Sequence, residues 1–384
     1  MKIALAHKRL DHLGGTERDL YKTAEGLRDL GHEVHLFCSE FAVPPPPGTQ
    51  SHMVSVIPLG RTARMLSFAA RAPRLIAQTD CDVTVSFGRM IDQDVLRSGG
   101  GTHRGFLQRL GEKGGVRRRL WQHFSFYHRS LLALEKRQFE AGRIKKIIAV
   151  SDEVKRDIIA QYAVNPNQIT VLYNGVDAQR FHPSRRPDFN RRVRERWKIP
   201  LDAPLVVFVG SGFRRKGLDR LMTLWNQPRC ASLSLLVVGH DARLASYKAW
   251  AESMAPMKIV FTGRQDEIES FYGAADIVAL PALQEAFGNV VLEALASGVP
   301  VLVSRDVGAS TLLSGRLSCG ILERPDDLEY VATKLLELLA SAKDPQLRQE
   351  ARAIGEAHSW ERHFQILETL LFEARRRPTA ARVS

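Results

Sequence analysis

One segment in the second half of the chain limits what the protein can fold into more than any other. A mostly apolar run at 275–280 has the length of a strand, and the run at 290–296 is apolar almost throughout, which is typical of a buried helix. Ser297-Gly298 ends this helix, and residues 301–304 form the next strand. A strand, a polar loop, a buried helix and a second strand make up the unit from which parallel sheets covered on both faces are built.

The same alternation of strand and helix patterns runs through both halves of the chain. Residues 2–7 predict a strand, Gly14-Gly15 predict a turn into a helix that ends near Gly31, and residues 33–38 predict the next strand. Further strands are predicted at 53–58, 82–87, 94–98, 147–150, 169–173, 205–210, 233–239, 259–263, 276–280 and 301–304. This repetition, with right-handed crossovers, predicts an α/β fold with doubly wound parallel sheets. At 384 residues the chain is long enough for two such domains, each with its own core.

A change in composition marks a boundary between the two predicted domains. Residues 181–204 contain four prolines among many arginines, which is typical of a linker with an exposed helix. We therefore predict an N-terminal domain at 1–180, a linker at 181–204 and a second domain at 205–357. Residues 358–384 are predicted as a C-terminal helical segment that ends in a frayed tail from Arg375 onward.

The polar loop before the buried helix carries groups that suit an anionic ligand. Asn289 is predicted as the N-cap of the helix, so that the amides from Val290 onward point out of its positive end. Such an end binds anions, and Gly288 would let a ligand come close to the backbone. Glu285 and Glu293 flank this position, which suits a ligand that is half phosphate and half polyol, such as a nucleotide-sugar. The alternative is structural, because many helices of α/β proteins begin with Gly-Asn and a glutamate can simply reach solvent.

A second candidate group follows the predicted strand at 205–210. The loop that begins at Ser211 carries Arg215 and Lys216 between two glycines, at the end of a buried strand, where α/β folds bind ligands. A guanidinium and an ammonium in this position can hold a diphosphate and stabilise its charge as it leaves. A solvated run of charge is the alternative, and the flanking glycines make it the weaker one.

Two glycine-rich loops in the first half of the chain are further candidates. Gly14 and Gly15 lack the spacing of the G-x-G-x-x-G dinucleotide fingerprint, so a nicotinamide cofactor is poorly supported. These two glycines either leave room for another ligand or only make a tight turn. Residues 99–105, G-G-G-T-H-R-G, are interpreted from the sequence alone as a flexible surface turn, with an open ligand loop as the alternative.

The charge distribution restricts the possible partners. The net charge is +13, and residues 97–146 hold 13 lysines and arginines against three glutamates, which gives this segment a net charge of +10. Aromatic residues are interleaved with these cations, which favours an anionic lipid surface over a plain solvated helix. No spacing typical of a nucleic-acid-binding motif accompanies the cations, so nucleic acid is not expected as a partner. An acidic or phosphorylated acceptor would also be attracted.

The sequence also predicts where the protein is found. No run approaches the roughly 18–20 apolar residues that span a bilayer, and the first residues lead directly into a strand without a signal-peptide cleavage site. The four cysteines are far apart, which fits reduced thiols better than disulfides or a zinc site. We expect a cytoplasmic protein, peripheral at the inner face of the cytoplasmic membrane through residues 97–146.

The motifs at these positions resemble those of family 4 glycosyltransferases, which are retaining enzymes of GT-B fold. Seven residues separate Glu285 from Glu293, and A-F-G-N-V-V-L-E-A-L-A-S-G-V-P-V follows the first of them. The sequence F-R-R-K-G-L-D-R around Arg215 and Lys216 is similar to the lipopolysaccharide core α-1,3-glucosyltransferase branch of that family. G-G-T-E-R at 14–18 and N-G-V-D further along give additional matches, so the resemblance covers nearly the whole chain.

This resemblance implies two Rossmann-like domains that face a cleft, with the C-terminal helix packing back on the first domain. It implies a retaining transfer of a hexose, with glucose expected, from a UDP-sugar to a lipopolysaccharide core or a similar anionic lipid-linked glycan. Arg215 and Lys216, with amides near Gly288 to Val290, would stabilise the departing nucleoside diphosphate. Glu285 would hold hydroxyls of the sugar, and Glu293 would hold those of the ribose.

The resemblance also implies roles for residues outside these two loops. Gly14 and Gly15 would lie at the cleft, Arg264 begins the loop that holds the base, and His103 is the candidate side chain that faces the sugar. Because no D-x-D motif stands beside these residues, cationic side chains would replace a metal, and no cofactor is expected. The oligomeric state is left open.

Two other functions remain compatible with the sequence. A nucleotide-sugar 2-epimerase has the same fold, and it would release a free sugar or its epimer without needing an acceptor. A basic protein that binds lipid or nucleic acid without turnover would explain the segment of charge +10. It would leave Glu285, Glu293 and the pair Arg215-Lys216 without a role.

Overall fold

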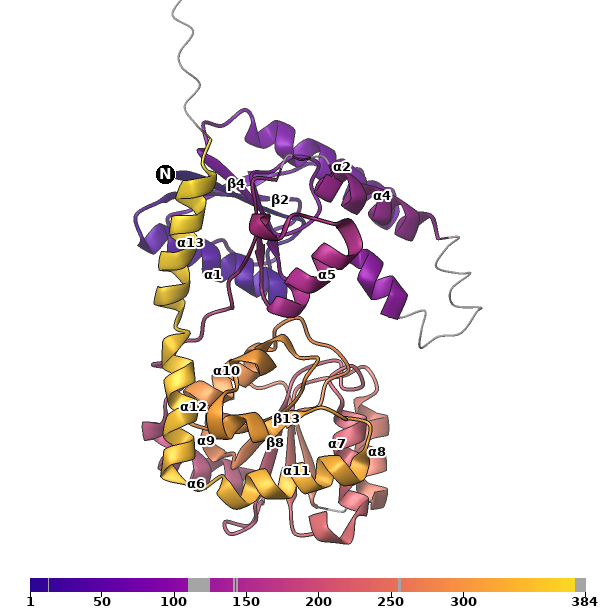
Figure 1. The fold of residues 1–384 in the computed structure, drawn as a ribbon, viewed down its shortest axis with the longest axis vertical. Coiled ribbons are helices and arrows are strands. Elements are labelled where there is room, and N and C mark those ends of the chain that lie inside the picture. Colours follow the sequence, from indigo (N-terminus) through magenta and orange to yellow (C-terminus); the bar gives the residue numbers. More distant parts are fainter. Residues whose placement is uncertain (13, 110–124, 141, 143, 255–256, 377–384) are drawn as a thin grey trace, which may run out of the picture. The chain divides into compact units, whose positions relative to one another are not determined.

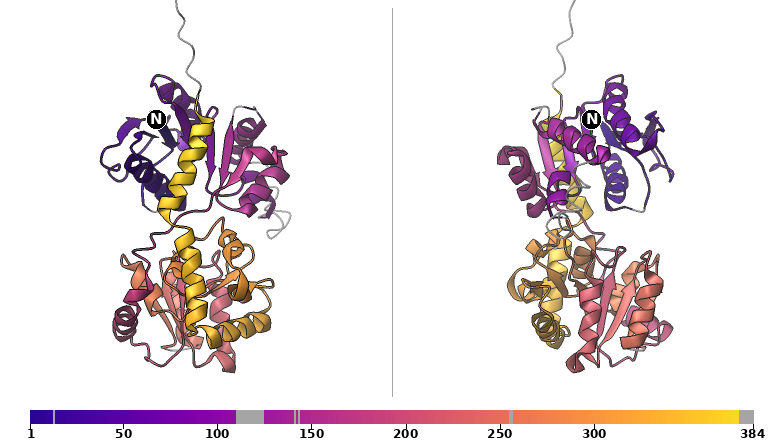
Figure 2. Two further views of the ribbon diagram at one scale, coloured as in Figure 1. Left: turned by 60° about the vertical axis from the view of Figure 1, so that its left-hand side comes forward. Right: turned by 90° about the vertical axis from the view of Figure 1, so that its right-hand side faces the viewer.

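The computed structural model describes residues 1–12, 14–109, 125–140, 142, 144–254 and 257–376. The chain divides into two compact units, of which the first combines Met1–Tyr173 with His363–Ser384 and the second is Asn174–Arg362. Each unit is built on one parallel sheet with helices packed on its faces (Figures 1 and 2). The predicted α/β class with two doubly wound sheets is therefore confirmed.

The sheet of the first unit has seven strands in the order β3-β2-β1-β4-β5-β6-β7. Its strands are β1 (Lys2–His7), β2 (Glu33–Cys38), β3 (Gln50–Met53), β4 (Val83–Ser86), β5 (Val95–Ser98), β6 (Lys146–Ala149) and β7 (Ile169–Val171). Its helices include α1 (Gly15–Asp29), α2 (Gly60–Ile76), α4 (Phe126–Glu140), α5 (Asp152–Tyr162) and most of α13 (Trp360–Ala374). β1 pairs in parallel with β2 on one side and β4 on the other, so the strand order reverses at β1.

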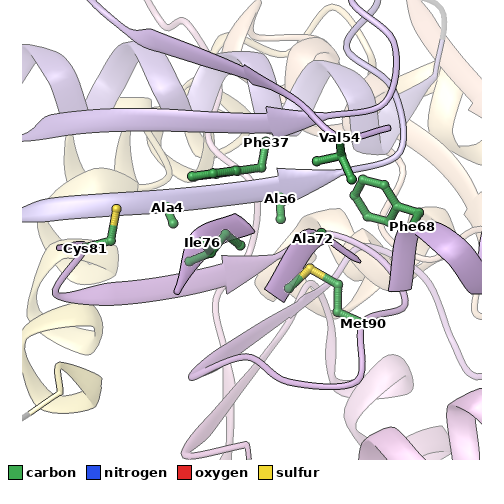
Figure 3. Packing of buried hydrophobic residues seen from close by; sticks show 9 residues of the cluster. All are labelled: Ala4, Ala6, Phe37, Val54, Phe68, Ala72, Ile76, Cys81 and Met90. Carbon is green, nitrogen blue, oxygen red and sulfur yellow. The ribbon is translucent and has the colours of Figure 1, made fainter. Parts of the chain in front are cut away.

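Small residues of β1 make room for large neighbours in the core of the first unit. Ala4 and Ala6 are fully buried and pack in one cluster with Phe37 of β2 and Phe68 of α2 (Figure 3). Val54, Ala72, Ile76, Cys81 and Met90 complete the cluster. Because burial of apolar surface is worth about 25 cal/mol per Å², this layer holds α2 against the sheet.

The C-terminal helix α13 packs on the first unit. Glu368 on α13 lies 2.8 Å from the ring nitrogen of His32, and Arg376 beyond the helix donates to Asp94 at 3.0 Å. Phe364 fits over Gly26 of α1, where an added Cβ would lie 2.2 Å from the phenyl ring. Arg376 also donates to Thr84 of β4 at 3.2 Å and so is not part of a frayed tail, whereas residues 377–384 lie outside the described residues.

His363 on α13 is expected to make the first unit less stable in acid. Its imidazole is buried and hydrogen-bonded to the Tyr173 carbonyl at 2.7 Å, and burial lowers the pKa of His363 to about 4. The unfolded chain, with an ordinary histidine pKa of roughly 6.5, therefore takes up a proton first. The contribution of His363 to stability is complete above pH 6.5 and is lost as the pH falls through 6.5 towards 4. In urea unfolding of the His363→Gln variant, the free energy of unfolding should fall less steeply between pH 6.5 and pH 4, by about 1.4 kcal/mol per pH unit.

The matched control is the exposed His12 in the same unit. His12→Gln should leave the dependence of the unfolding free energy on pH unchanged. An identical pH dependence in wild type and His363→Gln would show that His363 does not cause the acid sensitivity.

The sheet of the second unit has six strands in the order β10-β9-β8-β11-β12-β13, all parallel. They are β8 (Leu205–Val209), β9 (Ser234–Val238), β10 (Ile259–Gly263), β11 (Ile277–Leu280), β12 (Val301–Ser304) and β13 (Ile321–Leu322). The helices are α6 (Arg186–Arg196), α7 (Leu218–Thr223), α8 (Leu244–Met254), α9 (Ile268–Ala274), α10 (Asn289–Ala296), α11 (Leu328–Ser341) and α12 (Pro345–Ala357). The strands predicted at 205–210, 233–239, 259–263, 276–280 and 301–304 are confirmed.

Residues 181–204, predicted as a linker, are instead an integral part of the second unit, which already begins at Asn174. They form α6, which packs along α9, where Asn190 donates to the Ala274 carbonyl at 3.1 Å. Arg194 is almost completely buried and donates to Asp276 at 3.2 Å. The exposed helix predicted in this segment is present as α6, but the segment is not a linker, because one of its arginines is the partner of a buried carboxylate of the second unit.

Candidate active site

The strand order places one pair of loops at the expected ligand site of the second unit. Its order reverses between β8 and β11, which are neighbours in the sheet. Open parallel sheets bind ligands at the carboxyl ends of the strands where the order reverses. The loop after β8 carries Arg215 and Lys216, and the loop after β11 carries Glu285. The two strongest sequence motifs therefore meet at this point of the sheet.

These two loops are joined by charged and backbone contacts. Arg215 Nη1 donates to Glu285 Oε2 at 2.5 Å and to the Gln284 carbonyl at 3.3 Å, and Lys216 Nζ lies 3.9 Å from the same carboxylate. The Arg215 side chain is about half exposed, whereas those of Lys216 and Glu285 are largely buried. Two cations facing one carboxylate leave a net positive charge that can attract an anion.

Gly217 lets the two loops approach each other. It ends the loop after β8 with φ +82°, and a Cβ added to it would lie 1.8 Å from the Pro281 carbonyl oxygen. A left-handed conformation at such close range is open only to glycine. The contact between backbone atoms thus fixes Arg215 and Lys216 opposite Glu285.

The start of α10 differs from the prediction in two ways. The N-cap is Gly288, with φ +92°, and Asn289 is the first helical residue, whose Oδ1 accepts a hydrogen bond from Asn174 at 2.8 Å. Gly288 is required for packing, because an added Cβ would lie 2.8 Å from Val307 Cγ1. The Val291 amide donates to the Gly288 carbonyl, so the amides of Asn289 and Val290 are those at the positive end of the helix without a helical partner.

Glu293 is held by a residue that the sequence analysis missed. The hydroxyl of Tyr272 on α9 donates to Glu293 Oε2 at 2.5 Å, and Tyr272 is fully buried. This contact fixes the orientation of the carboxylate one turn into α10. A tyrosine in an apolar helix gives no sign in the sequence that its hydroxyl reaches a glutamate 21 positions away.

Three neighbouring strands of this sheet are followed by, or end in, a glycine with positive φ. Gly210 after β8, Gly239 after β9 and Gly263 at the end of β10 have φ values of +145°, +140° and +73°. A Cβ on Gly239 would lie 1.9 Å from the Gly210 carbonyl oxygen, and one on Gly210 would meet the Lys216 side chain at 2.6 Å. Ser211 and Arg264, both exposed, follow directly after two of these glycines. Without side chains, these glycines leave the carboxyl ends of the strands uncovered, and Lys216 packs against Gly210 at the end of β8.

The glycines at 14 and 15 play different parts at the end of β1. Gly14 is the N-cap of α1, and an added Cβ would lie 1.9 Å from Glu17 Oε2, whereas a Cβ on Gly15 would have no described residue within 4 Å. Glu17 lies 3.4 Å from His7 Nε2, and this contact lowers the pKa of Glu17 to about 2. The turn is therefore fixed on the Gly14 side and open on the Gly15 side.

The loop 99–105 is bound by side chains of α4 and α5, and its last residues are helical, so it is not an open surface turn. The Thr102 amide donates to Asp157 at 2.5 Å and the His103 amide donates to Glu135 at 2.7 Å. His103 Nε2 lies 2.9 Å from His128 Nδ1, and burial lowers the pKa of His103 to about 4, so the imidazole is neutral near pH 7. A neutral imidazole can exchange hydrogen bonds with a hydroxyl group.

Part of the basic segment 97–146 is described. Residues 110–124, 141 and 143 lie outside the described residues. In the described part, Phe126 at the start of α4 is 71% exposed, and the Arg61 guanidinium stacks over Tyr127. Among the described helices, none is long and apolar enough to cross a bilayer.

The four cysteines are unpaired, as predicted. Within the ranges that the structure describes, no group of three or more His, Cys, Asp or Glu side chains is arranged to hold a metal ion. Ser211, Arg215 and Lys216 lie in the loop after β8, Arg264 in the loop after β10 and Glu285 in the loop after β11, whereas Gly14, Gly15 and His103 lie after β1 and β5 of the first unit.

Two family models match consecutive parts of the chain. The glycosyltransferase family 4 model matches residues 13–180, and the glycosyl transferases group 1 model matches residues 189–357. The lipopolysaccharide glucosyltransferase WaaG of Escherichia coli K12 is 27% identical over 349 residues, which is 89% of this chain and 90% of the relative.

Solved structures have the same fold along nearly the whole chain. The crystal structure of WaaG, a glycosyltransferase involved in lipopolysaccharide biosynthesis, superposes with a TM-score of 0.80 at 23% identity, covering 96% of this chain and 99% of the other. Anabaena HepE in complex with UDP-glucose superposes with a TM-score of 0.69 at 17% identity, covering 97% and 100%. The fold is therefore GT-B, and the chain belongs to the glycosyltransferases, with a family 4 first domain and a group 1 second domain.

Proposed function

We propose that the protein is a retaining hexosyltransferase that moves glucose from a UDP-sugar to a lipopolysaccharide core intermediate or a similar lipid-linked glycan. The observation that carries this proposal is the cluster of Arg215, Lys216 and Glu285 where the strand order of the second sheet reverses, beside the start of α10. The name of the relative WaaG supports the acceptor class, and the UDP-glucose complex of HepE supports the donor.

The geometry suggests how the donor would be bound. A diphosphate would compete with Glu285 for Arg215, because a guanidinium binds phosphate oxygens in the same way as carboxylate oxygens. Glu285, released from Arg215, would then accept hydrogen bonds from hydroxyls of the sugar. Lys216 and the amides of Asn289 and Val290 would stabilise the charge that develops on the leaving diphosphate. Cationic groups would thus do the work that a metal ion does in other transferases.

The rest of the nucleotide would extend over the neighbouring strand ends. Glu293, oriented by Tyr272, would hold the ribose hydroxyls. Arg264 would lie at the base and Ser211 near the phosphates, because both residues follow glycines at strand ends of this sheet, Ser211 after β8 and Arg264 after β10, with β9 between these two strands. In this proposal the second domain binds the nucleotide-sugar.

The first domain would receive the acceptor. Gly14, Gly15 and His103 follow β1 and β5, and the open side of Gly15 offers backbone to a ligand. The +10 charge of residues 97–146 suits an anionic glycolipid and the inner face of the cytoplasmic membrane, where each cation near the surface contributes about 1 kcal/mol.

The test is thermal stabilisation by UDP, GDP, ADP and their sugars, with and without a chelator. We expect UDP and UDP-glucose to raise Tm equally in both conditions, since a ligand at 100 times its Kd adds about 2.7 kcal/mol to the stability. In Glu293→Ala, the UDP affinity should fall about 10- to 100-fold, because one charge-assisted contact is worth about 1.5–3 kcal/mol. No shift with any nucleotide, or a shift that the chelator abolishes, would contradict the proposed donor site.

A product assay separates transfer from epimerisation. A transferase consumes UDP-glucose in proportion to added acceptor and retains the anomeric configuration in the product. An epimerase would convert the sugar without acceptor, and this result would replace the proposed reaction with the alternative.

A further inference from the structure

Two buried carboxylates bind the backbone of the loop 99–105. Glu135 on α4 accepts from the His103 amide at 2.7 Å with one oxygen and from the Arg104 amide at 3.1 Å with the other. Asp157 on α5 accepts from the Thr102 amide at 2.5 Å. Three consecutive amides, which begin the helix at 103–109, are thus bound to side chains that come from distant parts of the chain.

Glu135 is itself fixed by its surroundings. It has no exposed surface, and its two oxygens also accept from Arg89 and from the Tyr162 hydroxyl, the latter at 2.7 Å. A carboxylate without solvent is costly unless donors satisfy both of its oxygens, and here the donors do so. Because apolar side chains of similar volume often give equal stability at such positions, the stability of the first unit alone does not account for Glu135.

Two glycines of the loop allow it to pack closely on Asp157. A Cβ on Gly101 would lie 2.8 Å from Asp157 Oδ2, and a Cβ on Gly105 would lie 2.1 Å from Asp157 Oδ1. Among the residues that the structure describes, none has an atom within 4 Å of a Cβ added to Gly100. The loop is therefore packed on the carboxylates on one side and open at Gly100.

We infer that Glu135 is a positioning residue that holds the loop 99–105 in the conformation in which His103 and the open backbone at Gly100 meet the acceptor glycan. This inference rests on the proposed function. Glu135 does not touch the substrate, and it acts through the two amides that it binds. Loss of its charge weakens both contacts and leaves the loop with several conformations, of which few are productive.

The first test is the Glu135→Gln variant. A glutamine keeps the volume of the side chain, but its NH₂ group can no longer accept from an amide. With UDP-glucose and acceptor, kcat/KM for the acceptor should fall about 100-fold, because a misplacement of about 1 Å can cost this much. The Kd of UDP, whose proposed site is in the second unit, should stay within about twofold of wild type, given that distant sites act independently.

The matched control is Glu140→Gln on the same helix. Glu140 is exposed and pairs with Lys136 across one helical turn. This variant should retain the wild-type kcat/KM and the same Kd for UDP. An unchanged kcat/KM in Glu135→Gln, or a parallel loss in kcat/KM, UDP affinity and Tm, would overturn the positioning role.

Gly100→Ala keeps the inference testable if Glu135→Gln folds poorly, and hydrogen exchange gives a second measurement if Glu135→Gln folds. Gly100→Ala adds one methyl group on the open side. It should lower kcat/KM for the acceptor about tenfold or more, because the methyl group would clash with the bound acceptor. Tm should not change, as is usual for a substitution at an open surface position. Hydrogen exchange of the amides of 102–104 should be faster in Glu135→Gln than in Glu140→Gln, whether or not sugar transfer is measured. Unchanged exchange refutes the positioning role, whereas faster exchange in a protein whose wild type transfers no glucose refutes the proposed function and keeps the role of Glu135 in the loop.

Discussion

Replacing Lys216 by alanine is expected to lower kcat about 10²- to 10³-fold, which is the loss typical of removing one group that stabilises charge in a transition state. Lys216 is largely buried, with Nζ held between the Gly210 backbone and the Glu285 carboxylate, so its charge stands in a fixed position at the end of β8. A fixed cation stabilises the diphosphate more as negative charge develops on it, so kcat should change more than KM. Steady-state kinetics with UDP-glucose and the acceptor measure both constants.

Arg214 provides the control for this experiment. It is an exposed cation in the same loop, two positions before Lys216. Arg214→Ala removes the same net charge and should leave kcat within about twofold, as is usual for surface substitutions away from a site. Equal losses in both variants would mean that only the overall charge of the loop matters, and a fully active Lys216→Ala would remove Lys216 from the proposed mechanism.

Gly217→Ala is expected to destabilise the second unit by about 2–5 kcal/mol, which combines the cost of a left-handed conformation with the cost of overpacking. The new Cβ cannot stay 1.8 Å from the Pro281 carbonyl oxygen, so the loops after β8 and β11 must separate. Because Arg215 and Glu285 then lie further apart, UDP affinity and activity should fall as well. Calorimetry measures the loss in Tm, which is roughly 2–4 °C per kcal/mol for a unit of this size.

Gly212 separates the two causes of this effect. Its φ of +74° is close to that of Gly217, but an added Cβ would meet only Arg215 Nε at 4.0 Å. Gly212→Ala therefore carries the conformational cost of about 1–2 kcal/mol without the clash. If both variants lost the same stability, the contact between Gly217 and Pro281 would not hold the loops together.

Local patterns were sufficient to predict most of the sheet. Buried parallel strands appear as short apolar runs, and β1, β2, β4, β8 and β11 were found in this way. The strand predicted at 53–58 is wrong, because β3 is Gln50–Met53, an edge strand whose residues are largely exposed. An edge strand has little apolar surface to bury, so its pattern is weak.

Contacts between residues far apart in the chain could not be predicted from local sequence patterns. The motif residues Arg215, Lys216 and Glu285 could be named, but the ion pair between them depends on the strand order. Asn289 looked like an N-cap because its side chain suits that position, whereas a hydrogen bond from Asn174, 115 positions earlier, holds it as the first helical residue. For the same reason Tyr272 and Glu135, which act on residues far away in the chain, were not identified.

The first unit combines residues from both ends of the chain, and this has a consequence for the order in which the protein folds during synthesis. This unit needs α13, the last described helix, and the residue Arg376 just beyond it. Glu368 and Arg376 contact His32 and Asp94, which precede them by 336 and 282 residues. During synthesis, the second unit, which is one continuous segment, leaves the ribosome in full before the first unit can close. The usual order of folding, with the N-terminal domain first, is therefore reversed in its last step, and a nascent chain that stops near residue 362 has a complete second unit beside an unfinished first one.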